Sequence, residues 1–170
     1  EELPTRFGPD VLLFRVLGRT LDRMPVSIAV LSNSGREYHF GWCRAEVEQA
    51  RALAAHGIAS FRFDAGGIGD SPASANAPAE VLYSEETIAD MGHAIDYVEK
   101  LDAGPIALVG RCSGAYAAFQ AAVPDVRVRN VAVFRIVRFV WDPSVTVAEA
   151  ARSGHRTSSG SVARSFSQRA

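Results

Sequence analysis

Four apolar runs rich in valine and isoleucine recur along the chain, and polar or helical stretches separate them. They are residues 26–31 (VSIAVL), 58–63 (IASFRF), 105–110 (PIALVG) and 128–136 (VRNVAVFRI). Short runs of this kind are typical of strands that are buried on both faces in a parallel sheet. We therefore expect four buried strands in the middle of the fold.

Two stretches between these runs have helical periodicity, residues 42–56 and residues 84–101. Ser84 is a candidate first residue of the second helix, and Gly57 is a candidate stop for the first. Apolar side chains at helical spacing would face the core: Val47, Ala50 and Ala54 in the first helix, and Ile88, Met91, Ile95 and Val98 in the second.

This order of strands and helices predicts right-handed crossovers, and hence a mostly parallel, doubly wound α/β sheet with helices on both faces. The run at 11–19 (VLLFRVLGR) is expected to add one or two edge strands. Residues 1–143 would form this core. Residues 144–170 end in a serine- and arginine-rich segment, which we interpret as a tail or the start of a lid.

The composition excludes several functional classes. A chain of 170 residues with 48% hydrophobic content is the size of one domain. A net charge of -1 gives no field that would attract nucleic acid or an anionic membrane, so a small-molecule partner is expected. No apolar run approaches the ~20 residues of a membrane span, and the N-terminal residues lack the pattern of a signal peptide.

The cysteines and histidines exclude further classes of site. Cys43 and Cys112 lie at the starts of different expected helices, which argues against a disulfide framework and favours a reducing, cytoplasmic location. Four scattered histidines give no metal-ligand spacing. We expect neither a metal nor a cofactor.

The segment ALVGRCSGAYAAF, residues 107–119, passes from a strand directly into a helix. A nucleophile presented on such a sharp turn needs small residues two positions before and after it. Gly110 and Gly114 meet this requirement around Cys112, whereas Arg111 and Ala115 would flank Ser113. The spacing therefore favours Cys112 as the exposed group. The alternative is a small cysteine buried between strand and helix.

The segment FDAGGIGDS, residues 63–71, follows the preceding strand at the same edge of the sheet. It lacks the lysine of a phosphate-binding loop and the third glycine of a dinucleotide-binding loop. We expect a structural turn in which Asp64 and Ser71 bond loop amides.

The order of these motifs resembles the α/β-hydrolase superfamily, and within it the serine-aminopeptidase-like branch and the hydrolases associated with exosortase systems. The matching segments are residues 33–35 (NSG), 51–71 (RALAAHGIASFRFDAGGIGDS), 110–115 (GRCSGA) and 138–143 (RFVWDP). This resemblance covers most of the chain. It implies that Cys112 is the nucleophile of an elbow.

The resemblance also implies an oxyanion hole, made by the backbone N–H of Ser113 and by an N–H from the loop Asn33, Ser34, Gly35. The same loop could be an ordinary turn. A catalytic acid and then a histidine should follow the nucleophile in the chain. The candidates after Cys112 are Asp125, Asp142, Glu149 and His155. Asp142, which follows the last expected strand, is the candidate acid. His155 is the candidate base, with a solvated loop histidine as the alternative.

Members of the superfamily normally have eight strands, more than are found here. We therefore expect the chain to be a fragment that lacks the last strands of the sheet. The predicted function is hydrolysis of carboxylic ester, thioester or lactone bonds through Cys112, with a small-molecule acyl substrate. The alternative is a hydrolase-fold protein that binds a ligand or partner without turnover, and the oligomeric state stays open.

Overall fold

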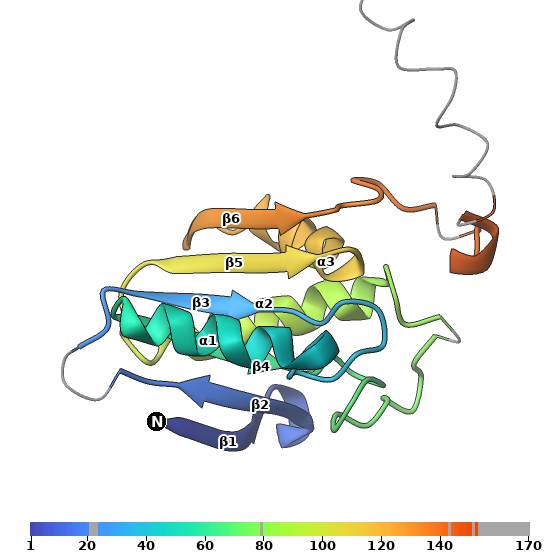
Figure 1. Cartoon of the computed structure of the whole chain (residues 1–170). Coiled ribbons are helices and arrows are strands. Elements are labelled where there is room, and N and C mark those ends of the chain that lie inside the picture. The colour runs from blue at the N-terminus through green and yellow to red at the C-terminus, as the bar shows by residue number, and fades with distance from the viewer. Residues whose placement is uncertain (21–23, 79, 143, 151, 153–170) are drawn as a thin grey trace, which may run out of the picture.

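A computed structural model of the chain describes residues 1–20, 24–78, 80–142, 144–150 and 152. Its centre is a six-stranded sheet with the strand order β1-β2-β4-β3-β5-β6 (Figure 1). The strands are β1 (Glu2–Phe7), β2 (Leu13–Gly18), β3 (Ser27–Leu31), β4 (Ile58–Phe63), β5 (Ile106–Arg111) and β6 (Val128–Phe134).

The sheet is mostly parallel, as the sequence predicts. β4, β3, β5 and β6 run parallel to one another, while β1 and β2 form an antiparallel pair at one edge. The carboxyl ends of β4, β3 and β5 therefore lie side by side at one edge of the sheet. In an open α/β sheet this is the edge where ligands bind.

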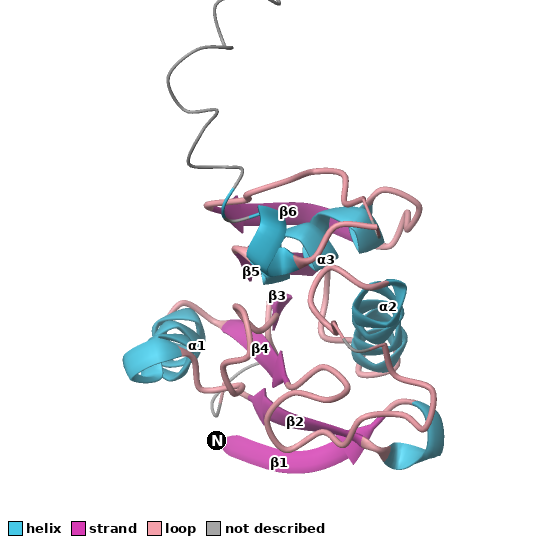
Figure 2. Ribbon diagram, turned by 90° about the vertical axis from the view of Figure 1, so that its right-hand side faces the viewer, coloured by secondary structure: helices cyan, strands magenta, loops and turns pink. Residues whose placement is uncertain are grey.

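Helices cover both faces of the sheet (Figure 2). Helix α1 (Ala45–Ala55) lies on one face, and α2 (Glu85–Glu99) and α3 (Ser113–Ala122) lie on the other. Two short 3-10 helices, η1 (Pro9–Val11) and η2 (Trp42–Arg44), precede β2 and α1. No helix in the part of the chain described by the structure is both long enough and apolar enough to cross a membrane.

The predicted start of α2 and the predicted stop of α1 are confirmed, while α1 begins three residues later and α2 ends two residues earlier than expected. The hydroxyl of Ser84 accepts a hydrogen bond of 3.2 Å from the N–H of Thr87, which satisfies one of the free donors in the first turn of α2. Helix α1 stops before Gly57, whose φ of 79° is a left-handed conformation that glycine adopts without strain.

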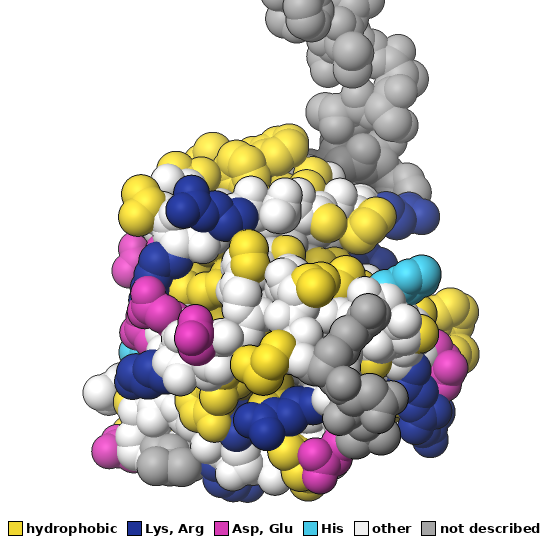
Figure 3. All heavy atoms as spheres, turned by 90° about the vertical axis from the view of Figure 1, so that its left-hand side faces the viewer, with side chains coloured by type: hydrophobic (Ala, Val, Ile, Leu, Met, Phe, Trp, Pro, Cys, Tyr) yellow, Lys and Arg dark blue, Asp and Glu magenta, His cyan; other side chains and the backbone are white. Residues whose placement is uncertain are grey.

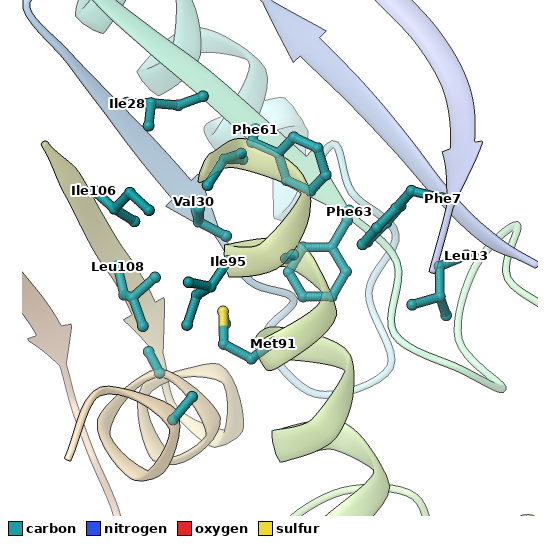
Figure 4. Packing of buried hydrophobic residues seen from close by; sticks show 14 of the residues in the cluster. Phe7, Leu13, Ile28, Val30, Phe61, Phe63, Met91, Ile95, Ile106 and Leu108 are labelled. Carbon is teal, nitrogen blue, oxygen red and sulfur yellow. The ribbon is translucent and has the colours of Figure 1, made fainter. Parts of the chain in front are cut away.

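The main core lies between the sheet and α2. Figure 4 shows Phe61, Val30 and Leu108 from three neighbouring strands facing Met91 and Ile95 of α2, and all five side chains are fully buried. A smaller cluster of Ala29, Leu31 and Ala50 lies under α1. This packing fixes the strands, and with them the loops at their carboxyl ends.

The first strand, β1, was not predicted from the sequence. Its segment ELPTRF carries a proline and mostly exposed side chains, so it has neither the apolar content nor the alternation that marks a strand. Proline lacks an N–H donor and is tolerated at the edge of a sheet, where β1 pairs with β2.

The prediction that residues 128–136 form a buried strand is wrong. β6 pairs with β5 on one side, and most of its side chains are exposed, with Val131 at 41% and Phe134 at 54%. The segment after it exposes Val137, Phe139 and Val140. Figure 3 shows apolar side chains gathered along the edge of the molecule that β6 forms. The apolar content identified the strand, but the strand lies at the edge of the described sheet.

Candidate active site

Cys112 lies at the sharp turn between β5 and α3, as the N-cap of the helix. Its backbone has φ 54° and ψ -118°, a conformation that non-glycine residues rarely adopt and that costs on the order of 1–3 kcal/mol. The N–H of Cys112 donates to the carbonyl of Phe134 at 3.0 Å, so β6 holds the turn in place. The Cys112 residue is partly exposed, and its thiol is free.

The two glycines around Cys112 are required by close packing. A Cβ added to Gly110 would lie well under 3.0 Å from the backbone of Gly114, and a Cβ added to Gly114 would lie equally close to the carbonyl of Asn33. The strand therefore approaches the helix at one glycine, and the helix approaches the loop after β3 at the other. These contacts are the steric reason that the motif is centred on Cys112.

The predicted oxyanion donors come from two segments, the start of α3 and the loop after β3. Ser113 is the first residue of α3, and its N–H has no hydrogen-bond partner within the described residues. The same holds for the N–H of Ser34. The N–H of Gly35, by contrast, donates to the hydroxyl of Ser113 at 2.8 Å. Of the four predicted oxyanion residues, Gly35 thus has its N–H held by a side chain, while the N–H groups of Asn33, Ser34 and Ser113 have no partner among the described residues.

The side chain of Asn33 is buried and joins two loops at the sheet edge. Its amide nitrogen donates to the carboxylate of Asp64 at 3.0 Å, and its amide oxygen accepts the N–H of Ala65 at 3.0 Å. Next to it, the hydroxyl of Ser32 donates to the carbonyl of Gly114 at 3.0 Å. The loop after β3 is therefore fixed both to the loop after β4 and to the start of α3.

The loop after β4 is a structural turn, as expected. The buried carboxylate of Asp64 accepts hydrogen bonds from the N–H groups of His39 and Asp70. Ser71 donates its hydroxyl to the Asp64 carbonyl at 2.6 Å and accepts the N–H of Phe14 at 2.8 Å. These contacts connect the loop to β2.

The ring of His39 contacts the carboxylate of Asp64, with 2.9 Å between Nδ1 and Oδ2, and lies against Phe14. His39, Asp64 and Asp70 place three possible metal-ligand atoms within 4.8 Å of one another. Both carboxylate oxygens of Asp64 already accept N–H donors, and His39 Nδ1 already contacts one of them. The cluster is a hydrogen-bonded junction between loops.

Tyr83 lies beside the thiol, and sequence analysis missed it. Its hydroxyl is 4.0 Å from Cys112 Sγ. Its ring stacks on Trp141, with centroids 4.2 Å apart and an interplanar angle of 11°, and it also packs against Tyr116. Burial, with the neighbouring Cys112 as a second cause, raises the pKa of Tyr83 to about 12. No spacing rule links a loop tyrosine to an elbow 29 residues later.

The remaining predicted site residues are not brought to the thiol by any described contact. Asp142 is exposed, and its carboxylate accepts both the N–H and the hydroxyl of Ser144, which lower the pKa of Asp142. His155 lies outside the described residues. Arg111 is exposed and pairs with Glu37 at 3.3 Å.

A cavity of about 130 Å³ opens on the α1 side of the turn, lined by Trp42, Glu46 and Arg111 among others. One carboxylate oxygen of Glu46 is buried without a partner in the described part of the chain. Burial raises the pKa of Glu46 to about 8, against the opposing effect of Arg62. Burial thus favours the neutral form of the Glu46 carboxyl in the wall of this cavity.

No family model matches this chain, and no curated protein matches it. Solved structures do match, among them a serine hydrolase without a lid from Xanthomonas campestris, XC6422. It has 18% identity and a TM-score of 0.65, and the match covers 84% of this chain and 64% of that one. The α/β hydrolase GrgF from Penicillium has 20% identity and a TM-score of 0.62 over 78% of this chain and 44% of that one.

DcsB, solved with a substrate analogue, has 17% identity and a TM-score of 0.64, and the match covers 78% of this chain and 45% of that one. The matches thus span 44% to 64% of the length of these three proteins. At such identities the likeness concerns the arrangement of strands and helices. That arrangement, with a strained turn between a parallel strand and the helix after it, gives this chain an α/β-hydrolase fold.

Proposed function

We propose that this protein hydrolyses carboxylic esters, thioesters or lactones, with Cys112 as the nucleophile. The observation that carries the proposal is the turn itself. A residue with a strained positive φ stands between two glycines that packing requires, and it presents a free, partly exposed thiol at the N-terminus of α3. A helix N-terminus favours the thiolate, which is the nucleophilic form.

The reaction would proceed through an acyl-enzyme. The sulfur of Cys112 attacks the carbonyl carbon, the carbonyl oxygen becomes an oxyanion, and the leaving group departs when the tetrahedral intermediate collapses. The free N–H groups of Ser113 and Ser34 are the proposed oxyanion donors, and one such donor typically contributes about 3 kcal/mol. Water then hydrolyses the thioester.

Asp142 is the proposed catalytic acid and His155 the proposed catalytic base. Both follow Cys112 in the order nucleophile, acid, histidine that the resemblance implies. The same resemblance supports placing the protein in the serine-aminopeptidase-like branch, beside the hydrolases associated with exosortase systems. The two unpaired cysteines support a reducing, cytoplasmic location. The neighbours XC6422 and GrgF are described as hydrolases, which agrees with the reaction class.

A second candidate function is ligand binding without turnover. It is favoured by one observation: the N–H of Gly35, a predicted oxyanion donor, is already held by the hydroxyl of Ser113. Transfer of the acyl group to an alcohol would use the same acyl-enzyme, and analysis of the products distinguishes it from hydrolysis.

The test is turnover of 4-nitrophenyl acetate by the wild type, Cys112→Ala, Cys112→Ser and Cys43→Ala. Cys43 is the matched control, because it is also a free thiol but lies exposed in η2. We expect Cys112→Ala to abolish turnover, Cys112→Ser to retain a small part of it, and Cys43→Ala to match the wild type. Equal turnover in the wild type and Cys112→Ala would reject the proposal, and binding of the ester without turnover would favour the second candidate.

A further inference from the structure

The hydroxyl of Tyr83 is the polar side-chain group that the described residues place in contact with the sulfur of Cys112. The separation of 4.0 Å leaves either atom able to act as the donor. The geometry therefore brings a phenolic O–H beside the sulfur that would attack a substrate carbonyl. A group at this position can exchange a proton with the reacting atoms.

The backbone of Tyr83 is itself unusual. Its φ of 63° is a left-handed conformation, which is strained for a bulky side chain. Such strain persists where the surroundings over-determine it, and it concentrates at functional sites. The strain therefore calls for a structural cause in the segment around Tyr83.

That cause is the cap of α2. The carbonyl of Val81 accepts the hydroxyl of Ser84 at 2.9 Å and also the hydroxyl of Thr87. The N–H of Thr87 donates back to the hydroxyl of Ser84 at 3.2 Å. Tyr83 lies inside this closed set of hydrogen bonds. Its ring is further clamped between Trp141 and Tyr116, so the hydroxyl is held in one place before any substrate arrives.

We propose that Tyr83 donates the proton to the departing alcohol oxygen, and that the site is therefore built for alkyl esters and lactones. The inference rests on the proposed function of Cys112. An alkyl ester or a lactone leaves as an alkoxide, which must be protonated as it departs. A thioester or a nitrophenyl ester leaves as a weaker base and gains little from a proton donor.

The step balances in both halves of the reaction. The ionised sulfur of Cys112 bonds to the carbonyl carbon, the bond from carbon to the alcohol oxygen breaks, and the proton of Tyr83 moves to that oxygen. Tyr83 is left as a phenolate. Water then attacks the thioester and gives its proton to the phenolate, the carbon–sulfur bond breaks, and the carboxylic acid, the thiolate and the neutral tyrosine result.

The acidity of the hydroxyl suits this role. The pKa of Tyr83, raised to about 12 mainly by burial, keeps the hydroxyl protonated at neutral pH. It is still well below the pKa of about 15.7 of water, whose conjugate base is comparable in strength to an alkoxide. Transfer of the proton from Tyr83 to a departing alkoxide is therefore downhill.

The experiment compares Tyr83→Phe with the wild type on two esters of one acid, ethyl acetate and 4-nitrophenyl acetate. The substitution keeps the ring and its stacking on Trp141 and removes the hydroxyl alone. General acid catalysis typically contributes about 10²- to 10⁴-fold. We expect kcat/KM for ethyl acetate to fall by at least about 10²-fold, and kcat/KM for 4-nitrophenyl acetate to stay close to that of the wild type.

Tyr116→Phe is the matched control, because Tyr116 packs on the same ring of Tyr83 and none of the described contacts brings its hydroxyl to the thiol. It should leave the ratio of the two rates unchanged. If His155 is the base that takes the proton of Cys112, His155→Ala should lower both rates by the same factor. Thermal unfolding of each variant shows whether it remains folded.

An unchanged ratio of the two rates in Tyr83→Phe would overturn the inference while leaving the function of Cys112 intact, provided that turnover still depends on Cys112. Loss of both rates by one factor would also overturn it, because it would show a merely structural role. If the wild type shows no turnover that depends on Cys112, the proposed function fails, and this inference fails with it.

Discussion

Replacing Asp64 with alanine tests whether the junction of loops at the sheet edge carries the stability of the site. The carboxylate accepts the N–H groups of His39 and Asp70 and the amide of Asn33, and it contacts the ring nitrogen of His39. The Asp64 side chain is fully buried. Its removal therefore leaves several donors without an acceptor.

An unsatisfied buried donor costs about 1–3 kcal/mol. The amide of Asn33 keeps its bond to the carbonyl of Glu37, but its buried N–H toward Asp64 should carry this cost in full. Water that enters the vacated space can reach the part-buried N–H groups of His39 and Asp70. We therefore expect Asp64→Ala to lower the free energy of unfolding by about 2–4 kcal/mol, out of a typical total of about 5–15 kcal/mol.

The assay is urea unfolding, followed by circular dichroism, of the wild type, Asp64→Ala and Asp70→Ala. The side chain of Asp70 is exposed, and its N–H still reaches Asp64 after substitution, so this control should stay within about 0.5 kcal/mol of the wild type. A loss below about 1 kcal/mol in Asp64→Ala, with an unchanged urea dependence, would refute the argument that the carboxylate holds the loops together.

Three further outcomes follow from the structure. Gly114→Ala forces a Cβ against the carbonyl of Asn33 and should cost about 1–3 kcal/mol in urea unfolding. Gly92→Ala, in α2 with no atom within 4 Å of the new Cβ, should instead gain about 0.5–1 kcal/mol, and a loss there would contradict the packing argument. Because the pKa of Glu46 is raised to about 8, the folded protein keeps a proton that the unfolded chain releases, so the contribution of Glu46 should lower stability as the pH rises from 4.5 to 8. Glu46→Gln should flatten this part of the stability profile, and an unchanged slope would show that Glu46 is ionised in the fold.

Local patterns along the chain were sufficient to predict the parallel part of the fold. The runs that form β3, β4 and β5 are mostly apolar because both faces of these strands are covered by helices, although β4 also buries Ser60 and Arg62. The strand β1 was missed because a proline-containing, exposed edge strand carries no such pattern. The prediction that β6 is buried was wrong, because apolar content identifies a strand but does not show whether a neighbouring element covers it.

In the candidate site, too, local patterns predicted some features and missed those that depend on tertiary packing. The glycines around Cys112 follow a steric rule that can be read from spacing, and the structure shows the contacts behind that rule. The contact between Tyr83 and Cys112 depends on how the loop before α2 folds back over the end of β5, so no local pattern could predict it. The occupation of the Gly35 N–H by Ser113 likewise arises from tertiary packing.

The most direct test of the account is to trap the acyl-enzyme. The wild type is mixed with 4-nitrophenyl acetate, quenched in acid within the first turnover, digested and mapped by mass spectrometry. The account predicts one acetyl group on the peptide that contains Cys112 and none on the peptide that contains Cys43, the other free thiol. Acetylation of both cysteines to the same extent, or of neither while the ester is being hydrolysed, would contradict the claim that Cys112 is the nucleophile.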